Sequence, residues 1–177
     1  MPPLTWAVVV ARWTGPVSVP VVLAFFDLPG AAVMMLVCLG ITIMWRARLP
    51  AGLELVSVLT LLVAAWSSVY YLYERLAYWD LVVHAAATAV LAELGYRALR
   101  RWGRLAEPGP VAHVLLVLCL GTSLALLWEY LELAGYVAVD RRVEVGYLDT
   151  MTDLLAGSAG SLVAGVVGAR SAVESDA

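Results

Sequence analysis

Long apolar segments separated by short polar breaks make up most of the chain. A helix needs about 20 mostly apolar residues to cross the hydrocarbon core of a bilayer, and six segments approach or exceed that length. They are residues 4–26, 30–45, 53–73, 79–99, 111–135 and 150–169. The pattern predicts an all-α membrane protein with about six transmembrane helices in a compact bundle.

The breaks between the segments contain turn-forming and charged residues. Residues 27–30 (DLPG) predict a tight turn, and Arg12 with Gly15-Pro16 interrupts the first segment. That segment is expected either to be kinked there or to start after Arg12. We expect residues 1–170 to form a single integral-membrane helical domain and the polar residues 171–177 to form a disordered tail.

Composition supports a membrane location and excludes two classes of function. AVILMFWYC residues make up 63% of the chain and charged residues 14%, against about 45–50% apolar and 25% charged in soluble domains. Eleven basic and fourteen acidic residues leave no basic surface for nucleic acid. All eleven basic residues are arginine, so a lysine Schiff base with retinal or pyridoxal phosphate is excluded.

The arginines also predict an orientation. Eight of them fall at breaks that share one side of the membrane, and three fall on the other. The positive-inside rule then puts both termini in the cytoplasm, which suits a bacterial plasma-membrane protein. The eight are Arg12, Arg46, Arg48, Arg97, Arg100, Arg101, Arg104 and Arg170, and the three are Arg75, Arg141 and Arg142.

Three successive segments each bring a pair of ionisable residues to the same outer depth. The pairs are three or four residues apart, so each lies on one helix face. They are Asp80 with His84, Glu129 with Glu132, and Asp149 with Asp153. An ionisable residue at the centre of a span costs about 2.5–3.5 kcal/mol on insertion scales and usually marks a functional site.

This donor set predicts a divalent metal site. One imidazole with several carboxylates suits Zn, Mn, Mg or Fe, and no thiols cluster nearby. We expect His84, Glu129, Asp149 and Asp153 to be the metal ligands. In this scheme Asp80 orients His84, and Glu132 is the general base on a metal-bound water.

Simpler explanations exist for part of this pattern. Asp80, Asp149 and Asp153 open helices, where acidic residues often serve as caps. At the inner side, Glu93 is expected to pair with Arg97, and His113 is expected to be structural. Small residues at four-residue steps in the last segment, Gly157, Ser161 and Gly165, predict close helix packing.

The same motifs carry a family resemblance over about residues 53–169. The strings Trp79-Asp80-x-x-x-His84, Trp128-Glu129-x-x-Glu132 and Asp149-Thr150-x-x-Asp153, followed by Gly157 and Gly160, resemble the YjdF-like bacterial inner-membrane proteins. More distantly they are similar to the VanZ-like membrane proteins, which are associated with glycopeptide resistance. The resemblance implies a multi-span helical fold and a shared site at His84, Glu129, Asp149 and Asp153, but no reaction.

Three functions are consistent with this sequence. The first is a metal-dependent hydrolase or transferase that acts on a lipid-linked phosphate or ester at the outer leaflet. The second is a small proton or ion transporter, in which Glu93 would be an inner station. The third is a non-catalytic membrane subunit or assembly partner. Membrane lipids are the expected partners, with a homo-oligomer or a larger membrane complex as further options.

Overall fold

The structure is a computed structural model that describes every residue except 1, 104–105, 107, 140, 142–144 and 176–177. Two of the arginines used for orientation, Arg104 and Arg142, therefore lie outside the described residues. The described part is all-helical, as predicted, and contains no strand. Its helices are α1 (Pro3–Phe25), α2 (Leu28–Ala47), α3 (Ala51–Val69), α4 (Leu72–Arg75), α5 (Trp79–Arg101), α6 (Pro110–Ala138) and α7 (Tyr147–Ser175).

The helices group into two compact units. The first unit, Met1–Trp79, contains α1 to α4, and the second, Asp80–Ala177, contains α6, α7 and all of α5 after its first residue. The single domain expected over residues 1–170 stays a prediction. The helical part of α7 reaches Ser175, which lies within the segment expected to be a tail.

Five helices in the described part of the chain are long and apolar enough to cross a membrane, namely α1, α2, α3, α6 and α7. Large apolar side chains on them are exposed, for example Leu39, Leu127 and Val163, as expected for surfaces that contact acyl chains. Helix α5 coincides with the remaining expected span and has 23 residues. Its charged residues, among them Glu93 and Arg97, explain why it is less apolar than the others.

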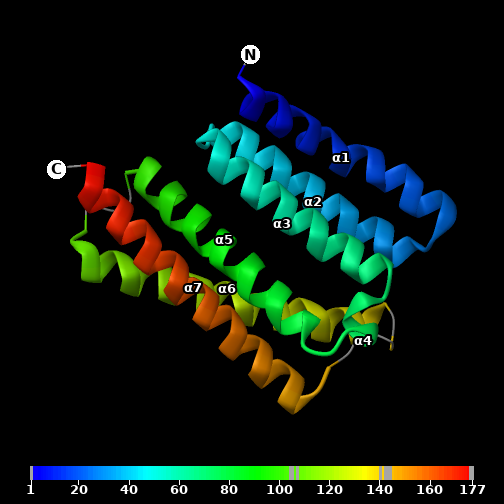
Figure 1. Cartoon of the computed structure of the whole chain (residues 1–177). Helices are drawn as coiled ribbons and strands as arrows, with labels where there is room; N and C mark the ends of the chain where they lie inside the picture. The colour runs from blue at the N-terminus through cyan, green and yellow to red at the C-terminus, as the bar shows by residue number, and fades with distance from the viewer. Residues whose placement is uncertain (1, 104–105, 107, 140, 142–144, 176–177) are drawn as a thin grey trace. The chain divides into compact units, whose positions relative to one another are not determined.

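In the first unit, α1, α2 and α3 pack side by side (Figure 1). Helix α1 begins at Pro3 and continues without a break through Gly15 and Pro16. A Cβ at Gly15 would lie 2.8 Å from Ile41 Cδ1, so the glycine allows α2 to approach closely and does not interrupt the helix.

An ion pair joins α1 to α3 inside this unit. Arg12 Nε donates to Glu54 Oε1 at 2.5 Å, and Arg12 Nη2 donates to Glu54 Oε2 at 2.8 Å. Glu54 is 2% exposed. This two-point geometry is the strong form of a charge-assisted hydrogen bond, and it compensates a carboxylate buried among apolar helices.

The helix boundaries follow from local chemistry. Asp27 caps α2 by accepting a hydrogen bond from Gly30 N at 2.8 Å. The chain breaks between α1 and α2 as predicted, but residues 28–30 form the first turn of α2 rather than a separate turn. The segment expected at 53–73 extends too far, because α3 ends at Val69 and Tyr71 adopts a left-handed conformation with φ 55°. Tyr73 Oη then donates to Ala64 O at 2.8 Å, which ties the short helix α4 back to α3.

In the second unit, α6 contributes one buried row and packs against α7 (Figure 1). Its buried residues recur at every fourth position, with ionisable groups at the ends and small or β-branched residues between them. They are His113, Val117, Gly121, Ala125 and Glu129. We call this row the α6 seam.

Helix α7 faces the α6 seam with small residues. A Cβ at Gly157 would lie 3.1 Å from that of Ala125, and a Cβ at Gly165 would lie 3.1 Å from Val114 Cα. The close packing predicted for this segment is therefore confirmed. A Cβ at Gly160 would overlap the backbone carbonyl of Ala85, so the backbones of α5 and α7 are in direct contact.

Candidate metal centre

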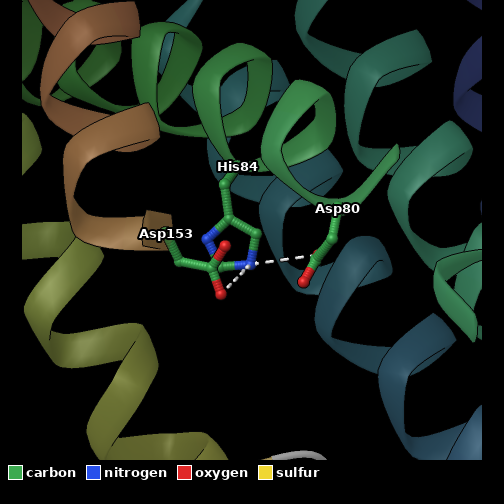
Figure 2. Close-up of side chains that lie close together, drawn as sticks. All are labelled: Asp80, His84 and Asp153. Atoms are coloured by element: carbon green, nitrogen blue, oxygen red, sulfur yellow. Dashed lines mark ion pairs between the residues drawn. The ribbon is translucent and has the colours of Figure 1, made fainter. Parts of the chain in front are cut away.

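Asp80, His84 and Asp153 converge on one point in the second unit (Figure 2). His84 Nε2 lies 3.3 Å from Asp80 Oδ1 and 3.8 Å from Asp153 Oδ2. One ligand atom from each residue lies within 4.8 Å of the others. In the described part of the chain this is the group of His, Cys, Asp and Glu side chains with a geometry that could hold a metal ion.

The packing of α5 against α7 positions these side chains. Asp80 and His84 share one face of α5 because they are four residues apart, and Asp153 comes from the second turn of α7. The contact between Gly160 and Ala85 backbone brings the two helices together about two turns further along. Any larger residue at Gly160 would separate Asp153 from His84.

The geometry changes the role expected for Asp80. A carboxylate that orients a metal-binding histidine accepts a hydrogen bond from the other ring nitrogen. Asp80 and Asp153 instead face the same nitrogen, Nε2 (Figure 2). In this geometry Asp80 lies where it could be a ligand beside His84, and its expected role of orienting His84 stays a prediction.

Glu129 adds a buried carboxylate from α6. It is 7% exposed and occupies the last position of the α6 seam. It interacts electrostatically with Asp153 and Glu132. Glu129 Oε1 and Asp153 Oδ1 are both buried without a hydrogen-bond partner, and unsatisfied buried polar atoms in a native fold call for an explanation such as a bound ion.

Glu132 and Asp149 lie at the edge of the same cluster, and both are half-buried. Glu132 interacts with Glu129, His84 and Asp80, and it is hydrogen-bonded to Trp128. Asp149 interacts with Asp153 from the first turn of α7. Of the six residues predicted for the outer site, the structure brings the ligand atoms of Asp80, His84 and Asp153 together. The other three, Glu129, Glu132 and Asp149, act on this group electrostatically.

The charge balance of this network suits a cation. Asp80, Glu129, Glu132, Asp149 and Asp153 are carboxylic acids, and His84 is the one basic group among those that act most strongly on Glu132 and Asp153. Uncompensated buried carboxylates cost several kcal/mol each. Oxygen donors with one imidazole fit Mg, Mn, Fe or Zn, so the residues present fit a divalent metal ion.

A second buried pair, which the sequence analysis did not identify, lies at the opposite end of the unit. His113 Nε2 is 3.7 Å from Glu93 Oε2, and neither atom has a hydrogen-bond partner. Arg97 Nε donates to Glu93 Oε1 at 2.7 Å, which confirms the expected local pair. His113 is remote from His84, as expected, and its neighbour Glu93 lies on another helix, so sequence spacing did not reveal the pair.

Comparisons with known proteins identify the family of this chain but no activity. They found no curated protein and no solved structure that matches this chain. One family model, described as "Predicted membrane protein (DUF2238)", matches residues 4–173, and the resemblance to YjdF-like proteins is consistent with it. The similarity to VanZ-like proteins stays a prediction. Because the match covers nearly the whole sequence, the chain belongs to this family of predicted membrane proteins.

Proposed function

We propose that the second unit binds a divalent metal ion through Asp80, His84 and Asp153, and that the protein is a metal-dependent hydrolase or transferase of a lipid-linked phosphate or ester. The observation that carries the proposal is the convergence of three ligand atoms within 4.8 Å. The buried, unpartnered Asp153 Oδ1 and Glu129 Oε1 beside them support it.

The residues around the triad have distinct roles in this proposal. A bound divalent metal would lower the pKa of a coordinated water and polarise a phosphoryl or carbonyl oxygen. Glu132 is half-buried beside His84, so it can accept the proton of that water. Glu129 and Asp149 supply further carboxylates next to Asp153.

A lipid substrate is supported by where the site lies along the helices. Asp80 and Asp153 lie in the first two turns of α5 and α7, and Glu129 lies in the last third of α6. In the proposed topology these positions would face the head-group layer at one membrane surface. Exposed tyrosines near the same helix ends, Tyr130 and Tyr147, are typical of that interfacial layer.

Metal analysis of the purified full-length protein tests the proposal. The wild type, loaded with Mn²⁺ or Zn²⁺ and freed of excess metal, is expected to retain stoichiometric metal. His84→Ala and Asp153→Asn are each expected to lose it. His113→Ala is the matched control, because it removes the other histidine of the chain and leaves the triad intact. A wild type without stoichiometric metal, or a His84→Ala variant that keeps it, would contradict the proposal.

Ion or proton transport is a second candidate, and the Glu93–His113 pair favours it. The pair lies at the opposite end of the α6 seam from Glu129, and the buried hydroxyls of Thr88 and Ser161 lie between the two ends. A Cβ at Gly168 would lie 2.7 Å from His113 Nε2 and 3.2 Å from Glu93 Oε2. The absence of a side chain at Gly168 leaves room for the buried pair beside α7.

Proton flux into proteoliposomes separates the two candidates. Transport predicts a flux that Glu93→Gln abolishes and that Gly168→Ala lowers by crowding the pair. Gly95→Ala is the matched control, because its Cβ would meet only Leu120 Cδ1, at 4.0 Å. A wild-type flux no higher than that of empty liposomes would reject transport.

A further inference from the structure

We propose that the centre holds two divalent cations bridged by the Asp153 carboxylate. The first ion is bound by Asp80, His84 and Asp153 Oδ2, and the second by Asp153 Oδ1 and Glu129, with Glu132 beside it. This inference rests on the proposed function and names the chemistry of the same site more narrowly.

The two oxygens of Asp153 have different surroundings. Oδ2 faces His84 Nε2 at 3.8 Å and belongs to the triad. Oδ1 is buried without a hydrogen-bond partner, in a side chain that is 2% exposed. A single ion at the triad uses only the first of these oxygens and leaves the second unexplained.

Glu129, on the neighbouring helix α6, also has a buried oxygen without a hydrogen-bond partner, Oε1. Its carboxylate interacts with Asp153 and with Glu132. Two neighbouring buried carboxylates that each have an oxygen without a hydrogen-bond partner cost free energy when both are ionised, because like charges repel and neither is solvated. A second ion between them would offset both the repulsion and the lost solvation.

The charge count points the same way. Five carboxylates, Asp80, Glu129, Glu132, Asp149 and Asp153, gather around one imidazole. With all five ionised, one divalent ion leaves three negative charges in this network and two leave one. Two ions therefore come much closer to balance in a helical unit that borders lipid.

Of the two substrate classes proposed above, a pair of ions favours the phosphate ester. Two metals about 3.5–4 Å apart stabilise both the attacking and the leaving oxygen of an in-line displacement at phosphorus. In such a hydrolysis, water oxygen forms a new bond to phosphorus and the bond to the lipid oxygen breaks. Glu132 takes the proton from water, and the leaving oxygen receives a proton from solvent. Water is the only co-reactant.

Manganese titration of the full-length protein tests the inference. The wild type in detergent is expected to bind two Mn²⁺ per chain, and its electron paramagnetic resonance spectrum is expected to show exchange coupling between them. Glu129→Gln is expected to bind one ion with an uncoupled spectrum. Glu93→Gln is the matched control, because it makes the same substitution at the opposite end of the unit and should keep two coupled ions.

The stoichiometry separates this inference from the proposed function. One uncoupled Mn²⁺ per wild-type chain would overturn the second ion and leave the triad standing. No bound Mn²⁺ would overturn both. Two coupled ions retained in Glu129→Gln would overturn the assignment of Glu129. The wild-type measurement decides the ion count even where a variant fails to fold.

Discussion

Glu54 illustrates, at the scale of single residues, what a buried charge requires of its surroundings. Its side chain is 2% exposed, and both of its oxygens accept hydrogen bonds from Arg12. Such a pair adds little to the free energy of unfolding compared with apolar residues in its place. Removal of one partner, however, leaves an uncompensated buried charge. The pair therefore makes the fold sensitive to loss of either residue alone.

Arg12→Ala is expected to destabilise the protein by about 3–5 kcal/mol, because Glu54 then remains buried without its partner. Thermal unfolding in detergent measures the change. Arg46→Ala is the control, since Arg46 is exposed in the last turn of α2 and an exposed substitution usually changes stability by less than about 0.5 kcal/mol. The double variant Arg12→Met with Glu54→Leu is expected to recover most of the loss. Equal stability of Arg12→Ala and the wild type would show that the pair does not hold α1 to α3.

Sequence spacing predicted contacts within a helix and missed most contacts between helices. The Glu93–Arg97 pair follows from a separation of four residues and is confirmed. The partners of Arg12 and His113 are far away in sequence, at Glu54 and Glu93. Depth along a helix follows from residue count, but the direction a face points depends on how helices pack. For that reason residue count predicted that Asp80, His84 and Asp153 share a depth. It could not predict that Asp80 and Asp153 face the same nitrogen of His84.

At the scale of helices, the contact between α5 and α7 determines the metal site. The backbone of Ala85 occupies the space where a side chain at Gly160 would be. Both atoms involved are held by helical backbone, so neither side can move without shifting a helix. The site is thus set by a glycine about two turns away from Asp153.

Gly160→Ala is expected to weaken metal binding and to destabilise the second unit by about 1–3 kcal/mol, the usual cost of overpacking. The added Cβ would push α7 away from α5 and separate Asp153 from His84. Metal titration and thermal unfolding measure the two effects. Gly95→Ala adds the same group where only Leu120 Cδ1 lies near, at 4.0 Å, and should change neither. Unchanged metal affinity in Gly160→Ala would show that this contact does not position Asp153.

The apolar pattern predicted which segments are helical more reliably than it predicted where the helices end. All six expected segments correspond to long helices. The early end of α3 depends on Tyr71 adopting φ 55°. Glycine and asparagine favour this conformation, so a tyrosine at this position gives no sequence signal for it. Similarly, Gly15 resembled a helix break but serves close packing against Ile41. In each case tertiary packing overrides a local signal.

At the scale of the whole molecule, the membrane topology depends on α5. Helix α5 contacts α7 at Gly160 and again at Gly168, through Ala85 and Glu93 respectively. Because α5 runs beside a candidate membrane span, we predict that it crosses the membrane as well. Six crossings would put both termini on one side, which we continue to predict is the cytoplasm.

Cysteine labelling tests this orientation. In a background with Cys38 and Cys119 replaced by alanine, Ser171→Cys is expected to react with an impermeant maleimide only after the cells are opened. Gly146→Cys, at the other end of α7, is expected to react in intact cells. Both positions are exposed. The reverse pattern would invert the orientation, and reaction of both positions in intact cells would contradict a spanning α7.

The α6 seam has a consequence for the membrane in which the protein works. Glu129 follows His113 by sixteen positions, so the two buried polar ends are about 24 Å apart at 1.5 Å per residue. This separation is slightly shorter than a hydrocarbon core of about 30 Å. Because the length of a helix is fixed, the distance between the two polar ends of the α6 seam is fixed too. In a thicker bilayer both polar ends would therefore lie further from water. The chemistry of the proposed metal site would thereby depend on acyl-chain length, with thinner bilayers giving lipid head groups easier access to it.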